Sequence, residues 1–346
     1  MIILAIETSC DDTCAAVLNN DQVLSNIISS QTDLHKEWGG VVPDIAKRAH
    51  MERIMPVINM ALKRAKTTFE KIDVIAVTQG PGLAIALSVG VNTAKELSIK
   101  YNKKLVAVNH VEGHVLSNLL KNKNDLPLRK IEFPAICLTV SGGHTKLVKI
   151  GQTQGSAHTY EYEVVGETLD DAAGEALDKA AKLLGLGYPG GPVLERLALQ
   201  SKETMLKLPQ PLQDKKILDY SFSGLKTSFY YQIKDWPKEK VNSNLANLAN
   251  DFQEAVFDTL VRKYKLAIIK YQPKTLLASG GVLANLTLRK KLRRLAKELK
   301  TPLFMPFKKE LNTDNAAMIG MVGYIKAQKK EWADPTTLDR DPRLNF

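Results

Sequence analysis

The sequence predicts an α/β protein of two duplicated lobes. At 346 residues the chain is longer than a typical single domain and suits two. Residues 2–18 predict a strand, a polar turn and a second strand, and residues 135–150 repeat this arrangement. We therefore expect two homologous halves, 1–130 and 131–346, with the polar segment 122–127 as a surface connection near the boundary.

Composition points to a cytoplasmic protein with an anionic partner. The formal net charge is +11 and the pI is about 9.3. These values suit a polyanion, although a basic protein without such a partner has the same composition. Three cysteines make no disulfide framework and favour a reducing compartment. No apolar run approaches the ~20 residues that span a membrane. The first expected strand, 2–6, leaves no room for a signal peptide, so we expect a soluble protein that enters no membrane.

Two histidines stand at the junction of a strand and a helix. The apolar run 105–108 predicts a buried strand, and a helical pattern begins near His110. His110 and His114 are four residues apart, roughly 40° around a helix axis, so they share one face. Open α/β sheets bind ligands at the carboxyl ends of their strands, and two imidazoles on one face can ligate a metal. Capping or surface histidines are the alternative.

A carboxylate near the C-terminus has the chemistry of a third ligand. The segment 312–315 predicts the start of a helix, with Thr313 or Asp314 as its cap. Either Asp314 is only this cap, or its oxygen completes a set of two histidines and one aspartate.

Glycine-rich turns follow several strands. The strand 74–78 runs into the Gly-Pro-Gly turn 80–82 and a helix, which suits phosphate binding but also serves as a plain tight connection. The strand 276–279 runs into the diglycine 280–281 and opens the helix that holds Asn285. A diglycine lets the backbone approach a flat ligand closely.

The second half also carries two charged surfaces. A helix expected from about 167 to 184 has an acidic stripe, Asp171, Glu175 and Asp178, which is solvated surface unless the glycine-rich loop 188–192 makes a site beside it. Almost every charged residue in the segment 289–309 is a lysine or arginine. That pattern is typical of a nucleic-acid or acidic-partner surface, and equally of a solvated helix face.

These features belong to a longer ordered series of motifs. The series is Ile-Glu-Thr-Ser-Cys-Asp-Asp, Gly-Gly-Val-Val-Pro, Gly-Pro-Gly, His-x-Glu-Gly-His, Val-Ser-Gly-Gly-His-Thr, Asp-Asp-Ala-Ala-Gly-Glu-Ala-x-Asp-Lys, Tyr-Pro-Gly-Gly-Pro, Ser-Phe-Ser-Gly-Leu-Lys-Thr, Gly-Gly-Val-x-x-Asn and Thr-Asp-Asn-x-Ala-Met. Spread over nearly the whole chain, it resembles the TsaD family of tRNA N6-adenosine threonylcarbamoyltransferases. The resemblance implies the actin-like ATPase (ASKHA) fold, with two duplicated lobes of mixed sheets flanked by helices.

The resemblance also implies site residues. The family's metal ligands fall on His110, His114 and Asp314, with Fe(II) or Zn(II) as the ion. Its substrate-binding positions fall on the following residues: Thr139, Val140, Ser141, Gly142, Gly143, Asp178, Gly191 and Asn285. One departure is Thr139-Val140, where Leu-Val is expected, a mild change because backbone groups are expected to make this contact.

The implied reaction moves a threonylcarbamoyl group from threonylcarbamoyl-AMP to N6 of adenosine 37 in tRNAs that read codons beginning with A, releasing AMP. The metal would act as a Lewis acid or as a template. Asp11, in the first turn, is a candidate to accept the N6 proton, and Asp12 is the alternative. The implied partners are tRNA, TsaB in a heterodimer and the ATPase TsaE, with TsaB facing the apolar helical part of the first half.

Two other activities deserve comparison. A kinase or ATPase of the same fold is possible because fold does not fix function, although magnesium prefers oxygen ligands to histidines. A metalloprotease needs a glutamate directly after its first histidine. Glu112 stands two residues after His110, roughly 200° around the helix, which makes the protease the weaker alternative.

Overall fold

The structure is a computed structural model that describes residues 1–153, 159–214 and 216–346. The chain divides into two compact units. The first contains Met1–Lys130 and Met305–Phe346, and the second contains Ile131–Gln152 and Tyr160–Phe304.

The first unit is built on a mixed sheet with the strand order β5-β4-β1-β2-β3-β6. β1 pairs with β2 and β2 with β3 in antiparallel fashion, whereas β1 with β4 and β4 with β5 are parallel. The strands are β1 Ile2–Glu7, β2 Asp12–Asn19, β3 Gln22–Ser30, β4 Val74–Gly80, β5 Lys104–Asn109 and β6 Lys121–Asn122. The sheet's helices are α1 Thr32–His35, α2 Pro43–Arg64, α3 Ala84–Lys100, α4 His110–Leu116 and α11 Ala316–Gln328.

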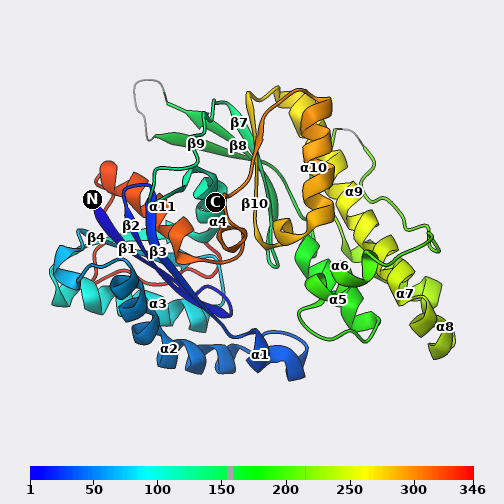
Figure 1. The fold of residues 1–346 in the computed structure, drawn as a ribbon, viewed down its shortest axis with the longest axis horizontal. Helices are drawn as coiled ribbons and strands as arrows, with labels where there is room; N and C mark the ends of the chain where they lie inside the picture. The colour runs from blue at the N-terminus through cyan, green and yellow to red at the C-terminus, as the bar shows by residue number, and fades with distance from the viewer. Residues whose placement is uncertain (154–158, 215) are drawn as a thin grey trace. The chain divides into compact units, whose positions relative to one another are not determined.

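Both faces of this sheet are covered because β1 and β2 are apolar on both sides. Side chains of a strand alternate between the two faces. Leu4 and Ile6 join a buried cluster with Ile58 of α2, and α2 and α3 lie together along that face (Figure 1). On the other face, Gly320 of α11 packs so closely on Leu18 that an added Cβ would lie 2.3 Å from its Cδ1. The core of the unit therefore lies on either side of β1 and β2.

The segment from Met305 onward packs in the first unit, although the sequence analysis places it in the second half, 131–346. The reason lies in α11, whose residues are apolar almost all round and buried from Ala316 to Gly323. A helix without a polar face must be enclosed. α11 meets this need by crossing β1, β2, β4 and β5.

The second unit repeats the design of the first. Its sheet has the order β11-β10-β7-β8-β9, with antiparallel pairs β7–β8 and β8–β9 and parallel pairs β7–β10 and β10–β11. This matches β5-β4-β1-β2-β3 strand for strand, so the predicted duplication is confirmed. The strands are β7 Ala135–Val140, β8 Thr145–Gln152, β9 Tyr160–Glu167, β10 Thr275–Ser279 and β11 Leu303–Phe304.

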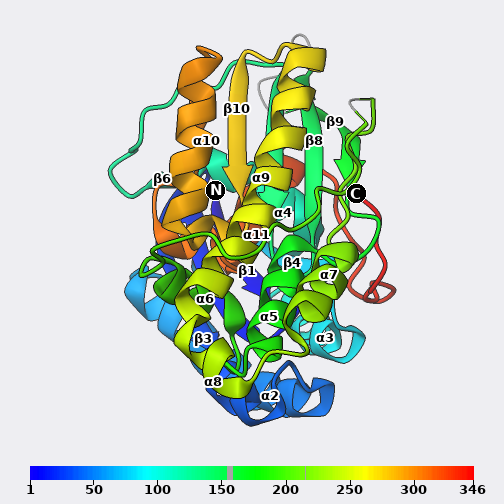
Figure 2. The same cartoon turned by 90° about the vertical axis from the view of Figure 1, so that its right-hand side faces the viewer.

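The described part of the second unit also contains the α-helices α5 Ala173–Leu183, α6 Gly190–Ala198, α7 Ser223–Ile233, α8 Lys238–Ser243, α9 Leu245–Tyr271 and α10 Leu286–Glu298. Figure 2 shows α9 and α10 running beside β10. The hydroxyl of the buried Tyr264 on α9 lies 2.9 Å from the carbonyl oxygen of Leu277, which ties this helix to the sheet. Among the described helices, none has both the length and the apolar character that crossing a membrane requires.

Candidate metal centre and ligand pocket

The two histidines lie at the start of α4, as the spacing predicts. β5 ends at Asn109, whose side-chain oxygen accepts hydrogen bonds from the backbone N–H groups of Val111 and Glu112. This N-cap fixes where the helix begins. His110 and His114 therefore share the face that turns into the unit, and they are 3% and 0% exposed.

Asp314 reaches both imidazoles. The cap of α11 is Asn315, which accepts a hydrogen bond from Met318 N, and neither Thr313 nor Asp314 takes this role. Asp314 Oδ1 lies 3.1 Å from His114 Nε2 and 3.5 Å from His110 Nε2. The three ligand atoms lie within 4.8 Å of one another. Two imidazole nitrogens and a carboxylate oxygen are the ligand types of a zinc or non-haem iron site.

A buried glutamate lies behind His110. Glu7, at the end of β1, places Oε2 3.0 Å from His110 Nδ1. Burial lowers the pKa of His110, but the carboxylates of Glu7 and Asp314 outweigh it and raise the pKa to about 9. Burial likewise raises the pKa of Glu7, yet the charge and hydrogen bond of His110 hold it below its ordinary value. The site thus favours a cation between its two carboxylates, which is the electrostatic condition for holding a metal ion.

Glu112 is not among the three residues whose ligand atoms meet at the candidate metal site. Its carboxylate lies 4.0 Å from Lys326 Nζ of α11. A metalloprotease needs a glutamate close to its metal, so this ion pair does not support the protease alternative.

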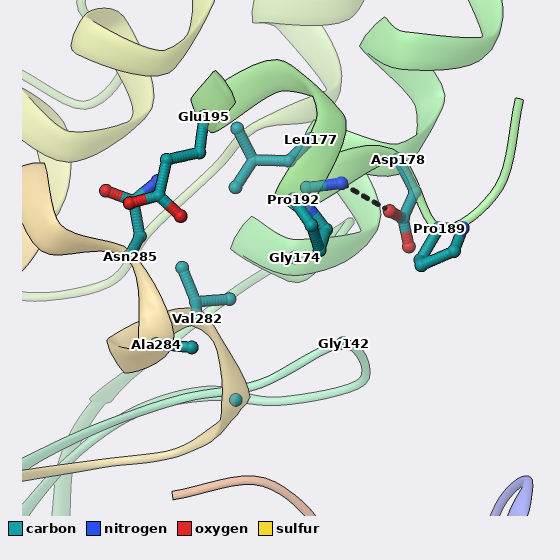
Figure 3. Close-up of a pocket in the computed structure, with 12 residues that line it drawn as sticks. Gly142, Gly174, Leu177, Asp178, Pro189, Pro192, Glu195, Val282, Ala284 and Asn285 are labelled. Carbon is teal, nitrogen blue, oxygen red and sulfur yellow. Dashed lines mark hydrogen bonds between the residues drawn. The ribbon is translucent and has the colours of Figure 1, made fainter. Parts of the chain in front are cut away.

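A pocket of about 180 Å³ lies in the second unit (Figure 3). It forms where β7 and β10 end side by side, the edge at which open sheets bind ligands. Its walls come from the turn after β7, from α5 and α6, and from the turn that opens α10. The lining residues are Gly142, Gly174, Leu177, Asp178, Pro189, Gly191, Pro192, Glu195, Gly281, Val282, Ala284 and Asn285.

Asp178 joins two walls of the pocket. The helix α5 begins at Ala173 and not near 167, because β9 extends to Glu167 and the chain turns before the helix. Asp178 Oδ1 accepts hydrogen bonds from Gly190 N at 2.8 Å and Gly191 N at 3.1 Å, at the start of α6. Figure 3 shows this carboxylate between its helix and Pro189.

Asn285 is the N-cap of α10. Its Oδ1 accepts hydrogen bonds from Thr287 N and Leu288 N, and its Nδ2 donates to Gln253 Oε1 at 2.7 Å. The side chain is only 7% exposed. In this structure both Asp178 and Asn285 therefore hold the pocket walls together through contacts that sequence spacing does not reveal.

The glycines of the pocket are of two kinds. At Gly190 an added Cβ would lie 2.4 Å from the Cβ of Ala181, so close packing explains the glycine. At Gly142, Gly143 and Gly191 an added Cβ would have no atom of the described residues within 4 Å. None of these three has a left-handed backbone. Neither close packing nor backbone conformation therefore explains glycine at these three positions.

The remaining predicted substrate residues lie at the end of β7. Thr139 and Val140 are fully buried in the sheet, and Ser141 Oγ accepts a hydrogen bond from His144 N. Their side chains shape the turn, and of the predicted segment 139–143 only Gly142 lines the pocket.

Two acidic residues at the sites have no role assigned to them from the sequence. Glu195, on α6, lines the pocket and accepts a hydrogen bond from Leu286 N at 2.7 Å. Glu7 is the other. A glutamate that ends an otherwise apolar buried strand is a sequence signal for Glu7, whereas Glu195 carries no such signal.

Asp11 lies in the turn between β1 and β2. Burial raises its pKa above the ordinary value, which makes the carboxylate a stronger base. The backbone oxygen of Asp11 accepts a hydrogen bond from Gln31 N.

The fold and the two sites define an α/β protein with duplicated sheets, a His-His-Asp metal-binding arrangement in one unit and a glycine-lined pocket in the other. A model of the TsaD family, described as tRNA N6-adenosine threonylcarbamoyltransferase, matches residues 22–321. The chain belongs to this family and is an acyltransferase that modifies tRNA. Relatives with that description include proteins of Thermosipho africanus, 43% identical over all of both chains, and of Thermosipho melanesiensis, 45% identical over all of both chains.

Solved structures support the actin-like fold. HypF of T. kodakarensis matches 95% of this chain and 48% of its own length, with a TM-score of 0.62 and 13% identity. The activator of the 2-hydroxyisocaproyl-CoA dehydratase from Clostridium difficile matches 96% of this chain and 99% of its own, with a TM-score of 0.52 and 13% identity. At such identities the likeness concerns the fold alone. The predicted actin-like ATPase fold is confirmed.

Proposed function

We propose that this chain transfers the threonylcarbamoyl group of threonylcarbamoyl-AMP to N6 of adenosine 37 in tRNAs that read codons beginning with A. AMP is the other product. Family membership supports the reaction type. The observation that carries the choice of donor is the pocket in which Gly142 and Gly191 leave room that no protein atom fills.

The pocket suits the AMP part of the donor. The N-terminal ends of α6 and α10 both border it. Their first backbone N–H groups already donate to Asp178, Glu195 and Asn285, so these ends suit the adenosine better than the phosphate. Leu177 and Val282 offer apolar surface to a flat base, while Asp178 and Glu195 can accept hydrogen bonds from ribose hydroxyls. Because Gly142 and Gly191 carry no side chain, the ligand can approach the backbone at both positions.

The chemistry requires little covalent help from the protein. The donor is a mixed anhydride, so the bond from the carbonyl carbon to the phosphate oxygen breaks as the bond to N6 forms, and N6 loses one proton. Asp11 is the proposed acceptor of that proton, because burial raises its pKa. Holding the donor and the adenine in place then accounts for most of the catalysis.

A single Fe(II) or Zn(II) ion is the proposed cofactor. His110 and His114 would bind it through Nε2 and Asp314 through a carboxylate oxygen, the atoms that the structure brings together. When bound, the ion supplies Lewis-acid or template chemistry for an anionic group of the donor.

The proposed partners are tRNA, TsaB and TsaE, and the proposed compartment is the cytoplasm. Exposed apolar side chains on the helices of the first unit support the TsaB interface. Met51 and Met55 lie about one turn apart on α2 and are 61% and 38% exposed, and Trp38 is 63% exposed. Exposed apolar groups of this kind mark contact surfaces for other proteins.

The pocket is tested by Gly191→Ala. The new methyl group meets no protein atom and α6 gains a better helix former, so stability should be kept or raised slightly. Binding of a non-hydrolysable threonylcarbamoyl-adenylate analogue should weaken, because the methyl group enters the ligand's space. Calorimetric titration measures this binding.

Gly190→Ala is the matched control. There the methyl group collides with Ala181 and Asp178, so the variant should lose stability. An unchanged affinity of Gly191→Ala for the analogue would place the adenylate elsewhere. Titration with ATP alone distinguishes a general nucleotide site, as a kinase would have, from an acyl-adenylate site.

A further inference from the structure

Glu7 is the least expected charge in the first unit. It ends β1, a strand of otherwise apolar residues, and its side chain is 1% exposed. An ionised carboxylate removed from water is costly unless hydrogen-bond donors surround it. The free-energy cost of burying this carboxylate must therefore be offset by its hydrogen-bond partners.

The hydrogen-bond partners of Glu7 are donors. Ser9 N donates to Oε1, and Thr78 Oγ1 donates to Oε2 at 2.5 Å. His110 Nδ1 lies 3.0 Å from the same Oε2. Because a carboxylate can only accept, this third contact requires a hydrogen on Nδ1 of His110.

A hydrogen fixed on Nδ1 leaves the other ring nitrogen to serve as the ligand atom. Nε2 of His110 points to the remaining ligands, 3.5 Å from Asp314 Oδ1. A neutral imidazole ligates through the nitrogen that carries no hydrogen. The contact with Glu7 therefore selects both the ring orientation and the tautomer that the metal needs.

We propose that Glu7 is a positioning residue for the metal ion, acting through His110. This inference rests on the metal site of the proposed function and extends it to a residue with no metal contact of its own. His114 has no matching support, since its buried Nδ1 has no hydrogen-bond partner in the described part of the chain. Ser9 Oγ also lies 3.1 Å from His110 Nδ1, but a hydroxyl can donate as well as accept, so Glu7 is the partner that fixes the hydrogen on Nδ1.

Glutamine cannot keep all the hydrogen bonds that Glu7 makes. If its amide nitrogen takes the place of Oε1, it faces the N–H of Ser9, donor against donor. If it takes the place of Oε2, it donates to His110 Nδ1 and moves the hydrogen to Nε2, where it blocks ligation. Either way one contact that the carboxylate makes is lost.

The test measures zinc affinity by competition with a chromogenic chelator. The variants are Glu7→Gln, Glu7→Asp and, as matched control, Glu112→Gln. Glu112 lies on α4 between the histidines and its carboxylate lies 4.0 Å from Lys326 Nζ, so that substitution removes a charge of α4 outside the Glu7–His110 contact. We expect zinc affinity to fall ~10–100-fold in both Glu7 variants and to stay unchanged in Glu112→Gln.

A second measurement needs no variant. In zinc-loaded wild-type protein labelled with ¹⁵N, the side-chain resonances of His110 should show a hydrogen on Nδ1 and the metal on Nε2. Wild-type affinity in Glu7→Gln, or ligation of zinc through Nδ1, would overturn the role of Glu7. His110→Ala distinguishes failure of the proposed metal site from failure of the positioning role of Glu7. If His110→Ala keeps wild-type zinc affinity, zinc does not bind at His110 and both proposals fail. Loss of affinity in His110→Ala with none in Glu7→Gln refutes the positioning role alone.

Discussion

Acidic side chains crowd the turn between β1 and β2. Burial, followed by the charge of Asp11, raises the pKa of Asp12 from its ordinary value near 3.8 to about 7. Oδ1 of Asp12 is buried without a hydrogen-bond partner among the described residues. Neighbouring carboxylates in such a cluster repel one another, and a bound cation reduces this repulsion.

The free energy of unfolding should therefore depend on the charge of Asp12 when metal is absent. A folded-state pKa above the unfolded one means that the folded chain binds more protons between about pH 4 and pH 7, so stability falls as the pH rises through that window. Asp12→Asn removes this effect. With a chelator present, its urea midpoint should exceed that of wild type at pH 8, and the difference should vanish toward pH 4.

Asp33→Asn is the control for that experiment. Asp33 is exposed, and its hydrogen bond with Lys36 holds its pKa below the ordinary value, the opposite direction. The variant should show no gain at pH 8. A constant difference between Asp12→Asn and wild type at all pH values would contradict the raised pKa.

Single residues differ in how far the sequence reveals them. His110 and His114 follow from helical spacing, because four residues bring two side chains to one face. The contacts of Asp178 with Gly190 and of Asn285 with Gln253 could not be predicted, because each joins elements that only the packed fold brings together. The residues alone predict Asp314 as either a cap or a ligand, and only the resemblance favours the ligand, because its contact with the histidines crosses 200 residues of sequence.

At the scale of elements, α10 divides its charges between two faces. Lys291 pairs with Glu254 and Asp258 of α9 and is neutralised there. Lys290, Arg293, Arg294 and Lys297 are exposed, while Leu288, Leu292 and Leu295 are buried. Because the helix begins at the pocket with Asn285, its exposed basic face is a suitable track for the phosphates of a bound tRNA.

Reversing Arg293, Arg294 and Lys297 to glutamate should weaken tRNA binding. Each lost phosphate contact reduces the salt slope of log K by about 0.7–0.9, so the slope should flatten as well as the affinity fall. Filter binding over a range of salt concentrations measures both. The control reverses Lys104, Lys123 and Lys329, exposed residues of the first unit, for the same change in net charge. If the two triple variants lose tRNA affinity equally, the effect comes from net charge alone and α10 is not the tRNA-binding surface.

Element boundaries show where sequence reasoning fails. The helix expected from 167 begins at Ala173, because the alternating residues of β9 extend the sheet to Glu167. The cap expected at Thr313 or Asp314 is Asn315. Neighbouring polar residues compete for a cap, and only the path of the chain decides between them. That one-residue difference leaves the Asp314 carboxylate to face the histidines.

At the scale of the whole molecule, duplication organises the fold. The two strand–turn–strand segments predicted from sequence are β1–β2 and β7–β8, and each starts a sheet with the same strand order. The location of α11 was not predictable in the same way, because an apolar helix can be enclosed by either sheet. Its return to the first unit brings Asp314 to the histidines of α4.

The central claim is that this chain performs threonylcarbamoyl transfer to tRNA. The direct measurement is mass spectrometry of nucleosides from tRNA incubated with the adenylate-forming enzyme, its substrates and the partner proteins, with and without this chain. We expect N6-threonylcarbamoyladenosine at position 37 only when the chain is present, and its loss with the His110→Ala, Asp314→Ala double variant. Modification that proceeds without the chain, or unmodified tRNA in the complete reaction, would contradict the account.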